Sequence, residues 1–268
     1  MDRLLVLRLE SHGVEAEAVF NGVPLLRVGP GRPVALVPVH EYTFSGGNRL
    51  ELLVQPGPPQ ALGAAPAPGG EAELSDGQRW ASVRLLLPRS AGVASPASAR
   101  TLAQLDWAPP ADEVCEWPVS QQTAVDLPIA FPRWRWVDAP VVVDSPTLKR
   151  EVVAYLRDIA LGLARGNPEP LVQASRLRLE DLAQAYQRNL ADDVGRLRLQ
   201  VQQSFAAQPL KPELPTVAKL LLRPVAGGRL LECLRPDGSP VLQSPVPGGH
   251  VAWPVRLAAI DGRFYVLR

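Results

Sequence analysis

The chain has 268 residues, 28 basic and 27 acidic side chains, and a mean hydropathy of zero. This composition is typical of a globular protein, and it excludes collagen-like, disulfide-scaffold and fully disordered chains. The formal net charge of +1 provides no overall attraction to nucleic acid or to anionic membranes. The 29 prolines and 21 glycines predict short elements separated by many turns.

The first 106 residues are expected to form an antiparallel β-sandwich domain, because short alternating apolar runs are separated by turn residues. Asn21-Gly22 lies between two such runs and is a strong hairpin signal, since both residues tolerate positive φ. The expected strands are 5–9, 14–20, 23–28, 34–39, 49–54 and 80–87. Residues 55–73 and 88–100, which are rich in small residues, proline and glycine, are expected to be loops.

The Asn21-Gly22 turn and a second turn at 46–48 together resemble a known fold. The order of Asn21-Gly22-Val23-Pro24 and then Gly46-Gly47-Asn48 before the run 49–52 resembles jelly-roll, galactose-binding-like modules. In those modules an Asn-Gly hairpin precedes a strand that begins with Gly-x-Asn-x-Leu. The resemblance implies the sandwich fold, and it makes carbohydrate binding by this domain one alternative function.

From residue 145 the apolar spacing changes to three and four residues, which predicts helices. Ser145-Pro146 is a helix-start signal, with serine as the N-cap and proline at the first helical position. Helices are expected at about 145–166, 170–175, 179–190 and 194–205, and strands at 217–223, 229–235, 241–244, 251–259 and 263–268. The sequence therefore predicts the α+β class, with a domain over 145–268 in which helices precede a curved antiparallel sheet.

This element order, together with the closing hairpin 260–268 around Asp261-Gly262, resembles the cystatin-like α+β roll of the nuclear-transport-factor-2-like superfamily. In that superfamily helices pack into the concave face of a bent sheet and leave a cone between them. The superfamily contains enzymes, dimerisation modules and ligand carriers, so the resemblance does not assign a function. Tyr155 and Tyr186 are the first candidates for a ligand-binding group in such a cone.

Residues 107–144 are expected to be a connector between the two domains, rich in proline and holding four of the six tryptophans. In an extended chain Trp134 and Trp136 share one side, and Arg133 and Arg135 share the other. One interpretation is an aromatic platform with neighbouring arginines that binds a sugar, a base or a partner's side chain. The other, which we favour, is that the tryptophans fill an irregular junction between the domains.

Cys115 and Cys233 are too few for a disulfide framework and too far apart for a typical metal site, so both are expected to be free thiols. The histidines, His12, His40 and His250, have no second ligand at metal spacing and are expected at turns or on the surface. The first ten residues lack the features of a secretory signal, and no segment approaches the ~18 apolar residues of a membrane helix. These observations predict a cytoplasmic protein without cofactor, metal, nucleic-acid partner or membrane partner.

The sequence has no Gly-x-Ser-x-Gly turn and no phosphate-binding loop between a strand and a helix, so no catalytic residues are predicted. The expected function is non-catalytic protein binding, and by analogy a bacterial immunity or secretion-system accessory role; a homodimer is also compatible with the sequence. One alternative is a small-ligand carrier or cofactor-free enzyme that uses the cone. The other is carbohydrate binding by the sandwich.

Overall fold

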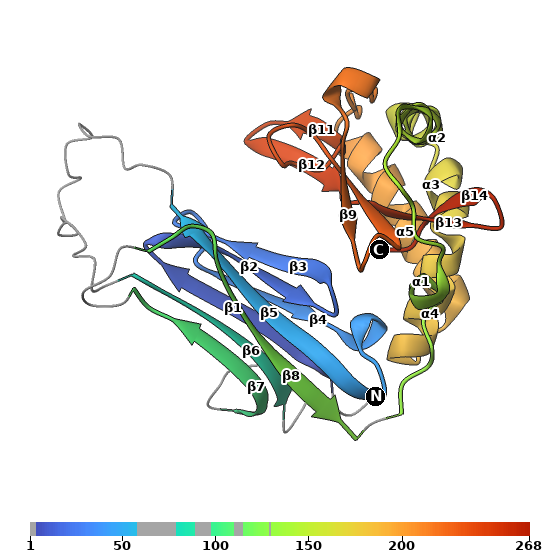
Figure 1. The fold of residues 1–268 in the computed structure, drawn as a ribbon. Helices are drawn as coiled ribbons and strands as arrows, with labels where there is room; N and C mark the ends of the chain where they lie inside the picture. The colour runs from blue at the N-terminus through green and yellow to red at the C-terminus, as the bar shows by residue number, and fades with distance from the viewer. Residues whose placement is uncertain (1–3, 58–78, 89–97, 110–114, 129) are drawn as a thin grey trace, which may run out of the picture. The chain divides into compact units, whose positions relative to one another are not determined.

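The computed structural model describes residues 4–57, 79–88, 98–109, 115–128 and 130–268 (Figure 1). The chain divides into two compact units, Met1–Pro132 and Arg133–Arg268. Antiparallel strands and α-helices are both present, which confirms the α+β class. Most of the two expected loops, 55–73 and 88–100, lies outside the described residues.

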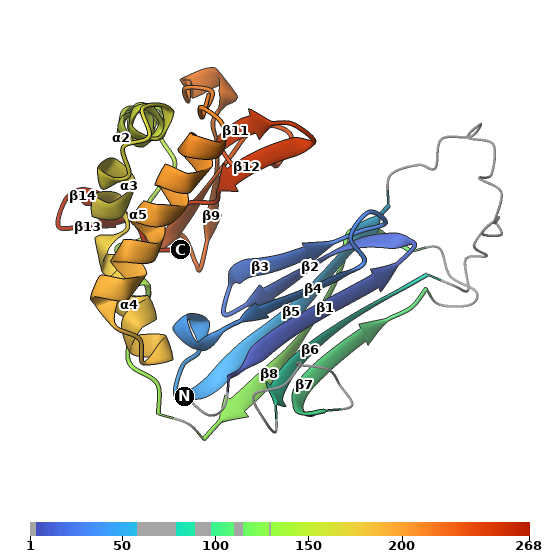
Figure 2. The same ribbon diagram turned by 180° about the vertical axis from the view of Figure 1, so that it is seen from behind.

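The N-terminal unit consists of two four-stranded antiparallel sheets, with strand orders β4-β1-β6-β7 and β3-β2-β5-β8 (Figures 1 and 2). The strands are β1 (Val6–His12), β2 (Val14–Phe20), β3 (Val23–Val28), β4 (Val34–Pro38), β5 (Gly46–Pro56), β6 (Trp80–Pro88), β7 (Ala99–Trp107) and β8 (Val119–Leu127). Alternate residues of the strands are fully buried, including Leu7 and Leu9 in β1 and Leu50 and Leu52 in β5. Contacts between β1 and β2, and between β5 and β6, join the two sheets around these side chains.

The predicted Asn-Gly hairpin is confirmed, because Asn21 and Gly22 join β2 to β3 with φ angles of 52° and 76°. The Asn21 side chain also reaches two other segments of the unit. Its Nδ2 donates to the carbonyl oxygen of Tyr42 at 2.7 Å and to Oδ1 of Asn48 at 2.8 Å. The turn therefore also fastens β5 and the short helix η1 (His40–Tyr42) to this end of the unit.

Strands β7 and β8 are not predicted by the apolar pattern. β7 begins in the expected loop 88–100, and β8 lies within the expected connector 107–144. Each strand is at the edge of its sheet, and most of its side chains are exposed or only half-buried, so the sequence lacks the alternation of a core strand. The boundary between the units follows Pro132, inside the expected connector.

The C-terminal unit contains the helices α1 (Arg135–Asp138), α2 (Pro146–Ala164), α3 (Glu169–Ala174), α4 (Arg176–Tyr186), α5 (Leu190–Ala207) and η3 (Val217–Lys219). Its strands are β9 (Leu221–Val225), β10 (Leu230–Leu234), β11 (Leu242–Val246), β12 (Gly249–Trp253), β13 (Arg256–Ile260) and β14 (Arg263–Val266). Four of them form an antiparallel sheet in the order β14-β13-β10-β9, and β11 and β12 form a separate hairpin. Apolar side chains of α2, α3 and α5 share one core with side chains of these strands.

The helix start at Ser145-Pro146 is confirmed, since Ser145 Oγ accepts a hydrogen bond from the backbone N–H of Leu148 at 3.1 Å. The expected single strand 251–259 is wrong. The chain instead forms β12 and β13, separated by Pro254, which has no backbone N–H to give to a ladder. The closing hairpin is confirmed: Asp261 and Gly262 have φ angles of 49° and 72° and join β13 to β14.

Candidate functional site

A surface pocket of about 650 Å³ lies in the C-terminal unit, between helices α2 and α3 and the β13–β14 hairpin. We call it the α2–β14 pocket. Its lining residues are Tyr155, Asp158, Ile159, Pro170, Gln173, Ala174, Arg176, Gly262, Arg263, Phe264 and Tyr265. This volume lies within the range of pockets that bind small molecules.

Local structure explains how these residues come together. Tyr155 and Ile159 are four residues apart in α2, so they lie on the same side of the helix. The tight turn at Asp261-Gly262 requires positive φ at both residues and returns the chain to place Phe264 beside α2. The Phe264 ring lies 5.8 Å from that of Tyr155, measured between centroids, at an angle of 54°. The pocket thus has aromatic walls and an apolar floor.

Three charged side chains line the pocket, and all three residues are exposed: Asp158, Arg176 and Arg263. None of them forms an ion pair with another residue of the described part of the chain. Two arginines against one aspartate leave the pocket with a formal excess of one positive charge. These groups are therefore available to a bound molecule.

Tyr155, which the sequence predicted as a ligand-binding candidate, is half-buried in the pocket wall. Its hydroxyl is inaccessible to solvent and has no hydrogen-bond partner among the described residues. Burial, with smaller contributions from Tyr265 and Cys233, raises the pKa of the Tyr155 phenol, so the hydroxyl stays protonated. The Tyr155 ring forms part of the pocket wall. Its hydroxyl, buried without a hydrogen-bond partner among the described residues, lowers the stability of the folded state.

Replacing Tyr155 with phenylalanine is therefore expected to stabilise the protein, by about 1 kcal/mol, because it removes a buried hydroxyl without a partner. Urea unfolding of the wild type and Y155F would measure the change. Tyr265→Phe in the same pocket is the comparison, since its hydroxyl is not among the buried groups without a partner. A loss of more than 1 kcal/mol in Y155F would show that the hydroxyl makes an essential contact.

The other tyrosine candidate, Tyr186, does not line this pocket. It is buried at the end of α4, and the guanidinium of Arg188 lies 4.6 Å from the centre of its ring. Arg188 also forms an ion pair with Asp193 at 3.6 Å, at the start of α5. Tyr186 and Arg188 therefore fasten the α4–α5 turn and are not placed to bind a ligand with Tyr155.

The tryptophan candidates are buried: Trp134 is 1% exposed and Trp136 is 2% exposed. The extended conformation expected for this segment is wrong, because residues 135–138 form the helix α1, with Trp134 at its N-cap position. In this segment Arg133 and Arg135 are exposed, whereas the two tryptophans are buried. Their indole rings are consequently not exposed as a flat platform for a sugar or a base.

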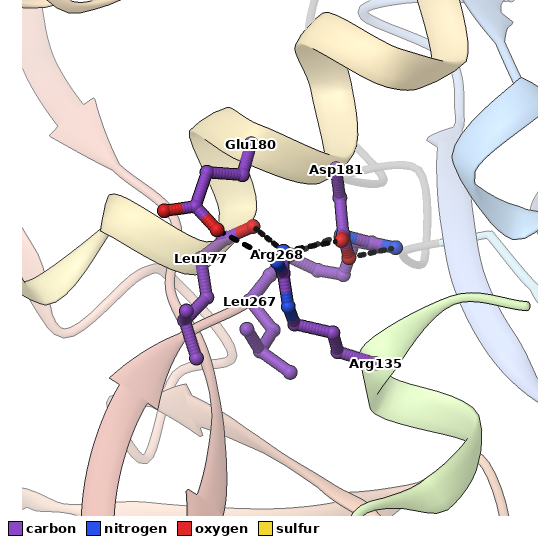
Figure 3. Close-up of polar contacts among 6 residues, drawn as sticks. All are labelled: Arg135, Leu177, Glu180, Asp181, Leu267 and Arg268. Carbon is purple, nitrogen blue, oxygen red and sulfur yellow. Dashed lines mark hydrogen bonds and ion pairs between the residues drawn. The ribbon is translucent and has the colours of Figure 1, made fainter.

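The two arginine candidates make contacts within the C-terminal unit. Arg133 forms a two-pronged, exposed ion pair with Asp138, and the hydrogen bond to its guanidinium lowers the pKa of that carboxyl. Arg135 donates from Nη1 to an Asp181 oxygen at 2.8 Å and from Nη2 to a Glu180 oxygen at 2.7 Å (Figure 3). Arg135 therefore connects α1 to α4.

Figure 3 also shows a buried ion pair that the sequence did not predict. Asp181 is buried in α4, and both Nη atoms of Arg268 lie 3.4 Å from its Oδ2. The side chain of Arg268 is only 1% exposed. Burial raises the pKa of Asp181 more than the two arginines lower it. The residue spacing within α4 could not indicate this ion pair, because Arg268 lies far along the chain, after β14.

The expected position of His40 is also wrong. It was expected at a turn or on the surface, but it is buried in η1, and its Nε2 accepts a hydrogen bond from the backbone N–H of Leu5 at 2.8 Å. Its ring meets that of Phe131 edge to face, with the centroids 5.5 Å apart. His40 thus has structural contacts in the N-terminal unit.

The space between helices and sheet, where the resemblance implied a cone, is occupied by side chains. Leu156 and Leu163 of α2 are fully buried in one cluster with Leu231 and Leu257 of the sheet. Ile159 belongs to this cluster and also lines the α2–β14 pocket, so the pocket lies at the edge of the core. Any molecule bound there meets the unit from its surface.

A second pocket, of about 300 Å³, is lined by residues 213–215, 219, 235–237 and 241. Its charged side chains are already paired. Glu213 forms ion pairs with Lys219 and Arg235, and Asp237 accepts hydrogen bonds from Ser239. The α2–β14 pocket is the better candidate because its charged groups have no such partners.

Among the described residues, no cluster of three or more histidine, cysteine, aspartate or glutamate side chains could hold a metal ion. The helices of the described ranges include none that is long and apolar enough to cross a membrane. No family model, no curated protein and no solved structure matches this chain.

Proposed function

We propose that this protein is a non-catalytic protein-recognition module, and that a partner inserts a side chain into the α2–β14 pocket. The observation that carries the proposal is the combination of aromatic walls with unpaired arginines in one surface pocket. Aromatic side chains and arginine are enriched in protein interfaces and at their energetically dominant positions. The filled core supports recognition at the surface over a reaction inside a cone.

The surroundings of the pocket also suit a protein partner. Leu161 is 37% exposed and lies one turn from Asp158 on the same side of α2. A large apolar side chain beside charged groups is typical of the mixed surface of a protein interface. The proposal therefore places the partner over the exposed side of α2 and the β13–β14 hairpin.

The proposal is tested with a substitution that fills the exposed edge of the pocket. Gln173→Trp places a large ring at the pocket lining, and Gln203→Trp makes the same change at an exposed site on α5 that does not line the pocket. Both variants are used, with the wild type, as bait in native lysate, and bound proteins are quantified by mass spectrometry. We expect one protein whose enrichment falls about tenfold with Q173W, a loss of ~1.4 kcal/mol of binding, and is unchanged with Q203W.

The same bait experiment can also contradict the proposal. If wild type and Q173W enrich the same proteins to the same extent, the pocket is not the recognition site and the proposal is wrong. Thermal unfolding of both variants shows that each is folded, so that a loss of binding reports on the pocket.

A further inference from the structure

The walls of the α2–β14 pocket favour a flat ring. Tyr155, Phe264 and Tyr265 supply three aromatic side chains, and the Tyr155 and Phe264 rings are tilted by 54° to each other. At a centroid distance of 5.8 Å these two rings contact each other, so a third ring would pack against the pair by stacking or edge to face, the arrangements that aromatic groups prefer. Ile159 and Ala174, both buried, provide an apolar floor on which such a ring can rest.

The charges of the pocket favour a negative group next to that ring. Arg176 and Arg263 have no ion-pair partner in the part of the chain that the structure describes, and only Asp158 opposes them. A guanidinium presents a planar set of donors that matches a carboxylate, and it interacts with aromatic faces as well. A carboxylate bound there would complete the charge balance of the pocket.

We infer that the α2–β14 pocket binds an aromatic ring accompanied by a carboxylate, supplied by an aromatic residue next to an acidic residue in the partner protein. The aromatic ring packs against the Tyr155–Phe264 pair over the apolar floor, and the carboxylate contacts Arg176 or Arg263. This inference rests on the proposed function, because it names the chemistry by which the partner is recognised.

Paired probes that differ only in charge test the inference. N-acetyl-Asp-Trp-amide and N-acetyl-Asn-Trp-amide represent the partner segment, and indole-3-acetate and indole-3-acetamide represent a free aromatic acid and its neutral form. Each is titrated into the full ¹⁵N-labelled chain, and the amide signals of Gly262 and Arg263 report binding at the pocket. We expect the Asp-Trp probe to bind about three- to fivefold more tightly than the Asn-Trp probe, and the difference to shrink as salt is added.

Single substitutions then assign the charge preference to the pocket. Arg176→Gln and Arg263→Gln should each reduce the preference for the Asp-Trp probe, and Asp158→Asn should increase it. Arg157→Gln is the matched control, since Arg157 is an exposed arginine of α2 that does not line the pocket. It should leave the preference unchanged.

The possible failures are distinguishable. Equal binding of the two dipeptides, or no binding by either, overturns the inference, and the proposed function then stands or falls on the Q173W bait experiment alone. Charge-dependent binding of indole-3-acetate without binding of the Asp-Trp probe overturns the peptide source. That result, together with an unchanged set of partners in Q173W, would replace protein recognition by binding of a free aromatic acid.

Discussion

Replacing Asp181 with alanine is expected to destabilise the C-terminal unit by about 3–5 kcal/mol, the usual cost of removing one partner from a buried ion pair. Arg268 would keep its guanidinium in a position where its side chain is 1% exposed, but without the carboxylate that faces it. Arg135 would lose one of its two carboxylate partners and keep Glu180. The dominant cost is therefore the loss of this carboxylate from beside the buried guanidinium of Arg268.

The matched control is the neighbouring carboxylate. Glu180→Ala removes the other partner of Arg135, but this pair is partly exposed, so the expected loss is less than about 1 kcal/mol. Urea unfolding, combined with hydrogen exchange of α4 peptides, would measure both variants in the unit concerned. A loss of less than 1 kcal/mol in D181A would contradict the buried pair that Figure 3 shows.

The second large effect is expected in the N-terminal unit, where Asn48→Ala should cost about 3 kcal/mol. The Asn48 side chain is buried, and its Nδ2 donates to the carbonyl oxygens of Phe44 at 3.0 Å and Gly46 at 2.8 Å. Its Oδ1 accepts from the backbone N–H of Phe44 and from Asn21 Nδ2, both at 2.8 Å. Alanine removes all four of these hydrogen bonds at once.

Two comparisons separate this network from a general effect of substitution. Asn48→Asp keeps the two acceptor contacts and loses the two donor contacts, so its loss should be substantial as well. Gln122→Ala changes an exposed amide of β8 and should be close to neutral. Faster hydrogen exchange of β5 peptides in N48A, but not in Q122A, is the expected observation; equal exchange in both would show that the asparagine network contributes little.

Local turn chemistry and apolar spacing were the parts of the fold that the sequence predicted well. Asn21-Gly22, Ser145-Pro146 and Asp261-Gly262 each impose a backbone geometry through the residues themselves, and all three lie where expected. Strands β7 and β8 escaped prediction because edge strands with polar side chains lack the signal of a buried face. The α1 helix escaped because a four-residue helix is too short to establish a period.

The candidate site was predicted only in part, for a physical reason. Tyr155 was named as a candidate ligand-binding group in the cone that the resemblance implied, but its neighbours Phe264 and Arg263 come from a hairpin about a hundred residues later. Spacing along the chain cannot reveal contacts of this kind. The tryptophan segment was conspicuous in composition, yet composition does not show that Trp134 and Trp136 are buried.

The central claim is that recognition occurs at the α2–β14 pocket and not at the tryptophan segment. Photo-crosslinking tests it most directly, with p-benzoylphenylalanine placed in turn at position 173 in the pocket, at position 133 beside Trp134, and at position 203 on α5. All three positions are exposed. The account predicts one discrete protein adduct from position 173 and none from positions 133 and 203. An adduct from position 133 with none from position 173 would contradict it.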